Sequence, residues 1–496
     1  MKNAFWKIFK LLLMILQPAA GILLLYQADS SNLFPEKYLY AGAVALVVLY
    51  VATVFLWRKH GRIAAVLAVL AVAVCVALTL AVQLAQKTMQ EIGNQNTQGF
   101  KVAVYVREDS AAESLSDVKN GVFGRNSVYD VDNTNAAQQS IEKELGRTIK
   151  TSEYEYVTQM IDALYSGKID ALILNEAYTG VLENQESYED FSTKTRIIYE
   201  YDAEMKVEEN TLEEPAGNVT SSAFLEQPFM IYISGSDSLT DDLSMGRSDV
   251  NLIAAVNPQT KQVLLINTPR DYYVRTSMSG KQKDKLTHAG IYGIQCSMDT
   301  LGMLYDEDIS YYMQINFTGF QTLIDAIGGI TVDVDEAGRT DDGFYFSEGP
   351  NEMNGEQALS FVRERHHYSD GDAARGRHQM AMITALIGKI SSGSTILMNY
   401  TDIMNGLQGM FATNVDSDDI AAFVKMQLNE NPQWTVKSYA VSGSGARETT
   451  YSAPGQPLYV MIPDEETVEH AAELIDRIYA GDILTDEDIG KIKEVE

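Results

Sequence analysis

Three apolar segments near the start of the chain constrain its architecture more than any other feature of the sequence. They cover roughly residues 5–26, 38–57 and 63–84. Each comes close to the ~20 consecutive apolar residues that a helix needs to cross a bilayer. A cleaved signal peptide is the alternative for the first segment, because basic residues precede its apolar core, but two further segments follow at once. We therefore predict a three-span membrane anchor over residues 1–86.

Basic residues indicate the orientation of this anchor, since cytoplasmic loops carry an excess of lysine and arginine. Lys2, Lys7 and Lys10 mark the N-terminal end of the first segment. Arg58, Lys59 and Arg62 crowd the loop between the second and third segments. The loop between the first and second segments holds two acidic residues and a single lysine. We expect the N-terminus in the cytoplasm and the chain beyond about residue 86 outside the cell. ATP is then not available as a substrate for the main part of the protein.

The overall charge and the cysteine count exclude several classes of protein. The 496 residues carry a formal net charge of −30. A nucleic-acid-binding protein needs a basic footprint for the phosphate backbone, so no nucleic-acid partner is expected. The two cysteines lie far apart in the sequence, and one is in an apolar segment, so a disulfide framework is not expected.

Beyond a polar stretch at residues 86–98, which we interpret as a linker, the pattern indicates a small α/β unit. An alternating strand at 100–106, a helix ending near residue 165 and a buried strand at 171–174 predict an extracytoplasmic accessory domain over residues 99–205. An acidic stretch with proline and glycine follows, and it predicts a linker over residues 206–228.

A larger α/β unit follows the second linker. Apolar strands at 229–234, 250–256 and 263–267 alternate with turns and later with helical patterns. This order predicts a mixed central sheet flanked by helices. We assign residues 229–395 to this main domain and residues 396–496 to its C-terminal part. Within the latter, the glycines and serines at 442–445 are interpreted as a flexible loop.

An arginine-rich stretch at residues 354–379 is the strongest candidate for a functional site. Four arginines, Arg363, Arg365, Arg375 and Arg377, fall within fifteen residues of an otherwise acidic chain. A planar guanidinium binds phosphate through two parallel hydrogen bonds and stays charged. The stretch therefore predicts a clamp for a di-anionic group such as a pyrophosphate. The alternative is a set of surface arginines paired with neighbouring carboxylates.

Other motifs accompany this stretch in a fixed order. They are Asp237, Arg247-Ser248-Asp249, Pro269-Arg270-Asp271, Phe320 through Gly328-Gly329-Ile330, Gly355 through Arg365, and Asp372 through Gln379. Over residues 229–395 this succession resembles the LytR-CpsA-Psr (LCP) family. The three spans and the inserted extracellular domain are similar to the CpsA-type capsule biosynthesis members, whereas the teichoic-acid-type members usually carry one span.

The resemblance implies a metal-dependent phosphotransferase of the bacterial plasma membrane. Such an enzyme moves a glycopolymer, for example a capsular polysaccharide, from a polyprenyl-pyrophosphate carrier to peptidoglycan. Fixed cations and a divalent ion would stabilise the charge that grows on the leaving phosphate. Capsule assembly proteins are candidate partners.

The resemblance also implies roles for individual residues. The implied pyrophosphate ligands are Arg270, Arg363, Arg365, Arg375 and Gln379. Asp237 and Asp249 would bind Mg²⁺ or Mn²⁺ or hold its waters. Arg270 and Asp372 are the catalytic candidates. Asp372 is a candidate general base on chemical grounds rather than from the resemblance, because a base would help the acceptor hydroxyl to attack. Structural roles are expected for Arg247, Arg377 and Asp271.

Two further groups of residues have a functional and a structural interpretation. His366, His367 and His378 lack the spacing of a zinc site, so we expect surface histidines. An apolar group could line a lipid cavity or pack as ordinary core. It comprises Met313, Ile315, Phe317, Phe320, Ile324 and Ile327.

A second class of function competes with the transferase. A membrane-bound regulator or receptor, of the transcription-attenuator type, would bind lipid-linked glycopolymer without turnover. We find no helix-turn-helix pattern in the sequence, and the expected cytoplasmic portion is short. Divalent-dependent release of product from a lipid pyrophosphate would separate the enzyme from a receptor.

Overall fold

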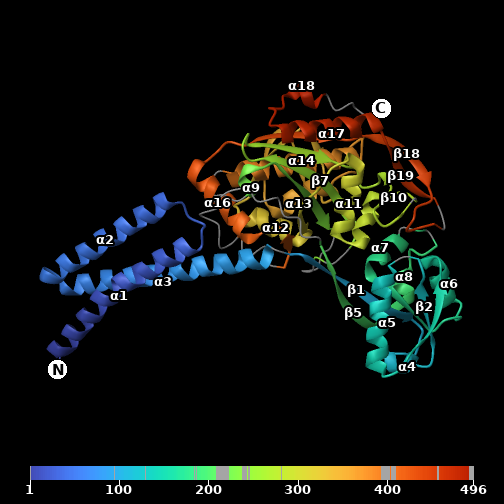
Figure 1. Ribbon diagram of the computed structural model, residues 1–496, viewed down its shortest axis with the longest axis horizontal. Coiled ribbons are helices and arrows are strands. Elements are labelled where there is room, and N and C mark those ends of the chain that lie inside the picture. The colour runs from blue at the N-terminus through green and yellow to red at the C-terminus, as the bar shows by residue number, and fades with distance from the viewer. Residues whose placement is uncertain are drawn as a thin grey trace.

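The computed structural model describes residues 2–93, 95–128, 130–183, 185, 187–207, 223–236, 243, 246–280, 282–391, 403, 409–454 and 457–490. The protein has two α/β domains, a smaller one and a larger one, and three long helices project from the larger domain (Figure 1). The expected fold class, an α/β protein with three N-terminal apolar helices and a mixed central sheet, is confirmed.

The helices of the anchor are α1 (Lys2–Ser30), α2 (Glu36–Lys59) and α3 (Gly61–Ile92), and all three are long and apolar enough to cross a membrane. With 32 residues, α3 is about 48 Å long, which exceeds the ~30 Å hydrocarbon core of a bilayer. Its last turns pack Ala85 and Met89 against Leu33, between α1 and α2, and against Ala421 of the main domain. The expected linker at 86–98 is therefore wrong for residues 86–92, because α3 continues and docks.

The accessory domain is built on a five-stranded mixed sheet of order β3-β2-β4-β1-β5. Its strands are β1 (Thr97–Arg107), β2 (Val122–Asn126), β3 (Lys150–Tyr154), β4 (Ala171–Asn175) and β5 (Thr195–Lys206). Alternate residues of β1 face opposite sides, as a strand requires. One side packs on α5 (Val131–Leu145) and the other on α6 (Val157–Tyr165), so both faces are covered.

The main domain contains a six-stranded sheet of order β16-β11-β6-β7-β8-β17. The strands are β6 (Phe229–Ser236), β7 (Ser248–Asn257), β8 (Gln262–Asn267), β11 (Tyr311–Asn316), β16 (Phe411–Thr413) and β17 (Thr435–Ala440). The strands β6, β8, β11 and β17 run in one direction, and β7 and β16 run in the other. Residues beyond 396 thus complete the same sheet.

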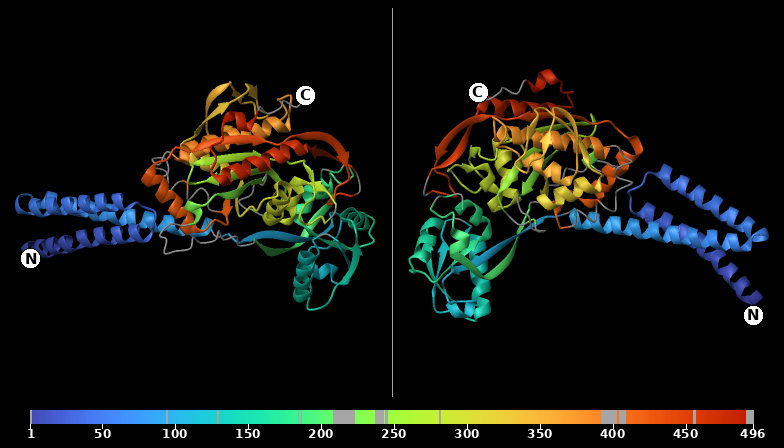
Figure 2. Two further views of the ribbon diagram at one scale, coloured as in Figure 1. Left: turned by 45° about the horizontal axis from the view of Figure 1, so that its top comes forward. Right: turned by 180° about the vertical axis from the view of Figure 1, so that it is seen from behind.

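Helices cover both faces of this sheet, which explains why its strands are apolar on both sides. On one face, Tyr232 and Ile266 pack with α11 (Ile294–Tyr305) and α17 (Glu465–Ala480). On the other, Ile231 and Leu265 pack with α14 (Asp372–Ser391) and α16 (Ser417–Glu430). Figure 2 shows the same layered domain from two further directions.

A separate apolar cluster lies beside the sheet. It joins α12 (Phe317–Ala326), α13 (Gly355–Arg363), β12 (Ile330–Val334) and β15 (Gly349–Met353). Ile324 and Ile327 are buried in this cluster, as the core-packing interpretation of that apolar group predicts.

The C-terminal part contains a hairpin where the sequence indicated a loop. Residues Gly443–Glu448 form β18, which pairs antiparallel with β19 (Leu458–Pro463). A Cβ on Gly443 would lie 2.3 Å from the Ile462 carbonyl oxygen. The glycine there permits close strand pairing, so the flexible-loop interpretation was wrong.

The accessory domain packs directly on the main domain. Tyr178 donates a hydrogen bond to the hydroxyl of Tyr292 at 2.8 Å, and the two buried rings meet edge to face. Val181 and Leu182 belong to the same buried cluster as Ile291 and Ala453 of the main domain. The two domains therefore share a continuous apolar core at this contact.

Candidate functional site

The strand directions bring several chain segments to one edge of the main sheet. Ser236 at the end of β6 pairs with Ser248 at the start of β7, and the chain leaves β8 toward Arg270 on the same edge. At the end of β11, Asn316 caps α12 by accepting a hydrogen bond from Gly319 N–H. Strand ends of α/β sheets are the usual place for ligand sites.

A cavity of about 590 Å³ opens at this edge. Its lining includes six arginines and one lysine. These cations are Arg247, Arg270, Arg363, Arg365, Arg375, Arg447 and Lys285. The cavity is therefore a concentration of positive charge in a chain whose net charge is −30.

Arg270 lies within a row of alternating charges inside this cavity. Its Nη1 donates to Asp249 Oδ1 at 2.6 Å, and both side chains are mostly buried. The carboxylate of Asp271 accepts from Lys285 Nζ at 2.9 Å and lies 4.0 Å from Arg270 Nε. The ion pair with Asp249 fixes the direction of the Arg270 guanidinium, and Asp271 forms its shorter contact with Lys285.

The exposed arginines Arg363 and Arg365 lie on either side of a buried carboxylate. Asn354 begins α13 with a capping box, and Arg363 is its last residue, with its guanidinium over the ring of Phe317 at 4.7 Å. Glu364 accepts hydrogen bonds from the backbone N–H groups of Asp341, His366 and His367. Burial raises the pKa of Glu364, but these bonds outweigh it, and the pKa is lowered overall. The ionised Glu364 thus fixes the turn that presents both arginines.

The second half of the arginine stretch lies at the start of α14. Gly376 approaches Asn267 at the end of β8 so closely that a Cβ would lie 2.1 Å from the Asn267 amide nitrogen. This approach places Arg375, which is 8% exposed, in the cavity lining. Gln379 also lines the cavity, and its Nε2 donates to the Val362 carbonyl at 3.3 Å.

The predicted pyrophosphate ligands Arg270, Arg363, Arg365, Arg375 and Gln379 all line this one cavity. The structure also places Arg247 in the lining, although the sequence gave it a structural role. In contrast, Arg377 pairs with Asp335 and Asp370 and is not part of the lining, as expected of a structural arginine.

Asp372, the predicted general base, lies beside the cavity without being part of its lining. Its Oδ1 is 2.5 Å from Arg375 Nη2, so it orients that guanidinium. Burial raises the pKa of Asp372, and Arg375 opposes the shift. Burial also lowers the pKa of Arg375, again against the effect of Asp372.

Acidic residues at the cavity are the candidate ligands of a divalent ion. Asp237 lies outside the described residues, and the strand before it ends at Ser236. Asp249 lines the cavity, and its Oδ2 has no hydrogen-bond partner among the described residues. Mg²⁺ takes only one or two protein carboxylates and completes its shell with water and phosphate oxygens. One accessible carboxylate oxygen in a cavity of this kind fits such an ion.

A second group of potential metal ligands includes two residues of the cavity lining, Asp341 and Glu364. One ligand atom each from Asp341, Glu364 and His367 falls within a 4.8 Å range. His366 and His367 are exposed, as expected. His378 is buried against Phe361, and burial lowers its pKa to about 4, so the surface prediction was wrong for this residue.

Several residues of the lining had escaped the sequence analysis. They are Lys285, His288, Arg447 and Tyr459. Lys285 and His288 are separated by three positions around the short helix α10 (Leu286–Ala289), whereas Arg447 and Tyr459 come from β18 and β19. Their shared position depends on contacts between distant segments. The Lys-x-x-His spacing is the one local signal that could have been noticed.

Comparison with known proteins identifies the family of this chain. The model of the LytR_cpsA_psr family matches residues 191–467, more than half of the chain. The chain belongs to the LytR-CpsA-Psr family. Much of the accessory domain, at residues 97–190, lies outside the part matched by the family model.

Two relatives of this LytR-CpsA-Psr protein carry the name polyisoprenyl-teichoic acid–peptidoglycan teichoic acid transferase TagU. The Enterococcus faecalis protein is 34% identical over 197 residues, which is 39% of this chain and 64% of the relative, less than two thirds of its length. The Bacillus cereus protein is 30% identical over 235 residues, covering 47% of this chain and 74% of the relative.

Solved structures of similar proteins include Bacillus subtilis TagU and a structure titled TagT bound to LI-WTA. The first is 25% identical and covers 52% of this chain and all of its own, with a TM-score of 0.41. The second is 21% identical and covers 55% of this chain and 97% of its own, with a TM-score of 0.42.

Proposed function

We propose that this protein is a membrane-anchored phosphotransferase that moves a glycopolymer from a polyprenyl-pyrophosphate carrier to peptidoglycan. The observation that carries the proposal is the cavity lined by six arginines and a lysine at the edge of the main sheet. A pyrophosphate is the ligand class that this lining matches, because each guanidinium can bind two phosphate oxygens.

The arrangement of the cations favours catalysis over simple binding. Arg270 and Arg375 are largely buried and held by Asp249 and Asp372, so their positions are fixed before substrate arrives. Fixed donors stabilise charge that develops in a transition state without reorganising. In the proposed reaction this charge grows on the lipid phosphate as it leaves.

We further propose that a divalent cation, Mg²⁺ or Mn²⁺, binds at Asp249, with Asp237 as the second candidate ligand. Such an ion would neutralise phosphate charge and orient the reacting group. The accessible Oδ2 of Asp249 supports this assignment. The Arg270 pair on Oδ1 fixes the carboxylate that would bind the ion.

The identity of the glycopolymer is proposed on separate grounds. The relatives with printed names are teichoic acid transferases, whereas this chain has three long apolar helices and an accessory domain. We propose a capsule-type polysaccharide as the cargo. The three helices would hold the cavity near the membrane that contains the lipid carrier, with the main domains on the extracytoplasmic side.

Product analysis with the full-length protein in detergent tests this function. The substrate is a polyprenyl-pyrophosphate saccharide, offered with and without peptidoglycan fragments, in Mg²⁺, Mn²⁺ or a chelator. We expect polyprenyl monophosphate to accumulate over many turnovers, and only when a divalent ion is present. Saturable binding without any product would instead support the receptor function.

A further inference from the structure

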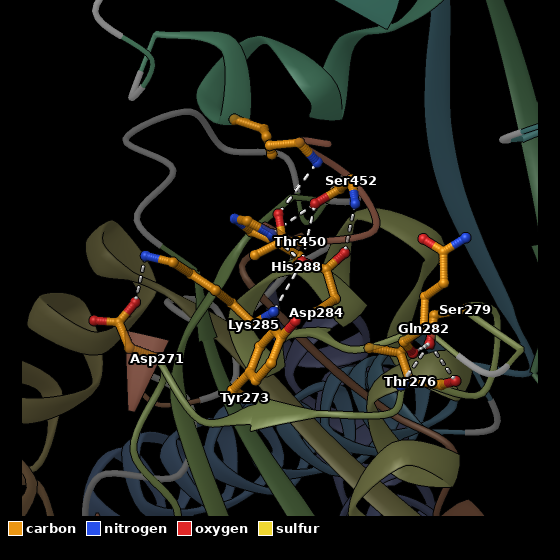
Figure 3. A network of polar contacts seen from close by, with 12 residues as sticks. Asp271, Tyr273, Thr276, Ser279, Gln282, Asp284, Lys285, His288, Thr450 and Ser452 are labelled. Carbon is orange, nitrogen blue, oxygen red and sulfur yellow. Dashed lines mark hydrogen bonds and ion pairs between the residues drawn. The ribbon is translucent and has the colours of Figure 1, made fainter. Parts of the chain in front are cut away.

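A buried polar network lies at the wall of the cavity, on the segment that follows Arg270. Asp284 belongs to β10 (Asp284–Lys285), and His288 lies four residues later on α10. His288 Nδ1 is 2.6 Å from Asp284 Oδ1 and 2.7 Å from Ser452 Oγ. Figure 3 shows these three residues together, with Lys285 reaching toward Asp271.

The hydrogen bonds of this network determine which nitrogen of His288 carries the proton. Asp284 accepts from the backbone N–H groups of Lys285 and Ser452 and from Ser452 Oγ–H, so both of its oxygens act as hydrogen-bond acceptors. A carboxylate oxygen that accepts takes its hydrogen bond from Nδ1–H of the ring. The lone pair of the neutral ring is then on Nε2.

The remaining nitrogen of His288 is available to the cavity. Only Nδ1 takes part in the hydrogen bonds of this ring among the described residues. Some buried side-chain atoms of the described residues lack a hydrogen-bond partner, but Nε2 of His288 is not one of them. His288 is part of the cavity lining. A carboxylate that orients a histidine with a free Nε2 is the arrangement of a general base.

The same geometry excludes Ser452 as a nucleophile. In a serine triad the hydroxyl approaches Nε2 and the carboxylate approaches Nδ1. Here Ser452 and Asp284 both contact Nδ1, and Ser452 is 5% exposed. Ser452 therefore holds the ring with Asp284 and does not react.

Packing around this segment fixes its position against the cavity. Gly290, two residues after His288, lies so close to the start of β7 that a Cβ would be 2.5 Å from the Gly246 carbonyl oxygen. Arg270 O accepts a hydrogen bond from Thr287 N–H at 2.9 Å. Behind the segment, Ala289 and Ile291 belong to the apolar core shared with the accessory domain.

We propose that His288 is the general base that removes the proton from the acceptor hydroxyl, with Asp284 as its positioning residue. The hydroxyl oxygen attacks the sugar-proximal phosphorus, and the bond between this phosphorus and the bridging oxygen breaks. Polyprenyl monophosphate leaves with the electron pair, and the proton of the hydroxyl passes to His288 Nε2. This inference rests on the proposed transferase function and assigns the proton to His288, whereas the sequence assigned it to Asp372.

Two variants separate a base from a structural histidine. In His288→Asn the amide nitrogen takes the place of Nδ1 and can donate to Asp284, but nothing replaces Nε2. We expect a fall in kcat of roughly 100- to 10,000-fold, the usual contribution of a general base. KM for the lipid substrate should stay within about threefold, because the arginines remain. Asp284→Asn should reduce kcat in the same way. The amide group of the new side chain would donate to Nδ1, so the neutral ring would carry its proton on Nε2 and could not accept one there.

The pH profile supplies a readout that packing alone does not affect. A general base gives kcat a limb at acid pH, and His288→Asn should lack the limb that wild type shows. Other charged and titratable groups lie near the ring. Wild type and His288→Asn both contain them, so they cannot cause a difference between the two pH profiles. They are Asp284, Lys285, Asp271, Arg247, Arg447 and Tyr451, beside the Asp249–Arg270 pair.

His288→Ala with added imidazole covers the case in which His288→Asn does not fold. Recovery of kcat by at least about tenfold supports the base, and absence of recovery in a folded protein overturns it. Asp372→Asn is the matched control and should keep the acid limb. The proposal is also overturned if wild type turns over and His288→Asn is equally active. If wild type itself yields no product, the transferase function fails instead.

Discussion

Lysine in place of Arg363 or Arg365 tests whether these two exposed side chains bind the pyrophosphate. Both line the cavity, and neither forms an ion pair with a carboxylate of the described residues. Lysine keeps the positive charge but loses the planar pair of donors. If the arginines bind phosphate in the transition state, lysine should not restore activity.

The experiment compares a small effect on folding stability with a large effect on rate. Arg363 contacts the Phe317 ring at 4.7 Å, and an exposed contact of this kind contributes about 0.5–1 kcal/mol to folding. Folding stability should therefore change little in either variant. Loss of a charge-assisted contact in the transition state costs about 2–4 kcal/mol, or roughly 30- to 1,000-fold in rate.

The assay is turnover of a lipid-pyrophosphate saccharide, with a melting curve for each variant. Arg339→Lys is the matched control, because Arg339 is also exposed and lies 5.7 Å from an aromatic ring, that of Tyr345, but is not part of the lining. It should retain full activity. Full activity of both Arg363→Lys and Arg365→Lys would refute the pyrophosphate clamp.

Three further predictions concern the metal, acid stability and topology. Asp249→Asn should lower turnover by about 100-fold or more and weaken folding by about 1–3 kcal/mol through its ion pair, measured by product release and urea unfolding; unchanged turnover would exclude Asp249 from the site. Burial lowers the pKa of His378 to about 4 in the folded protein. The neutral ring therefore makes its full contribution to stability above the unfolded pKa of about 6.5, and about 3 kcal/mol of the free energy of unfolding is lost by pH 4. His378→Phe should therefore unfold less readily than wild type as the pH falls from 6.5 to 4, and an identical pH dependence of the urea midpoint would contradict this. In whole cells, a membrane-impermeant thiol reagent should label Asp109→Cys, which is expected outside the cell, but not His60→Cys, which is expected inside. The two native cysteines are buried and should give little background labelling. Labelling of His60→Cys alone would reverse the orientation.

The positions of several strands along the chain and the arginine stretch could be predicted from local sequence. Strands such as β8 are buried on both faces, so they appear in the sequence as continuous runs of apolar residues. Arg363 and Arg375 could be assigned to one pyrophosphate site because they lie near one another in sequence and match a family motif.

Features that depend on distant contacts could not be predicted in this way. The end of α3 carries polar residues, but Met89 packs on the main domain, so the helix continues. Gly443 is in a strand because a partner segment approaches its backbone. Ser452 contacts His288 across 164 positions of sequence, and no local pattern records that contact.

Localising the phosphate after transfer tests the central claim most directly. A polyprenyl-pyrophosphate saccharide labelled at the sugar-proximal phosphate is incubated with the protein, a divalent ion and peptidoglycan fragments, and the products are separated and analysed by mass spectrometry. The account predicts that the label enters the peptidoglycan product as a phosphodiester and that the lipid leaves as a monophosphate. A lipid that leaves as a pyrophosphate with the label retained would mean attack at the sugar carbon, and it would contradict phosphoryl transfer in the arginine-lined cavity.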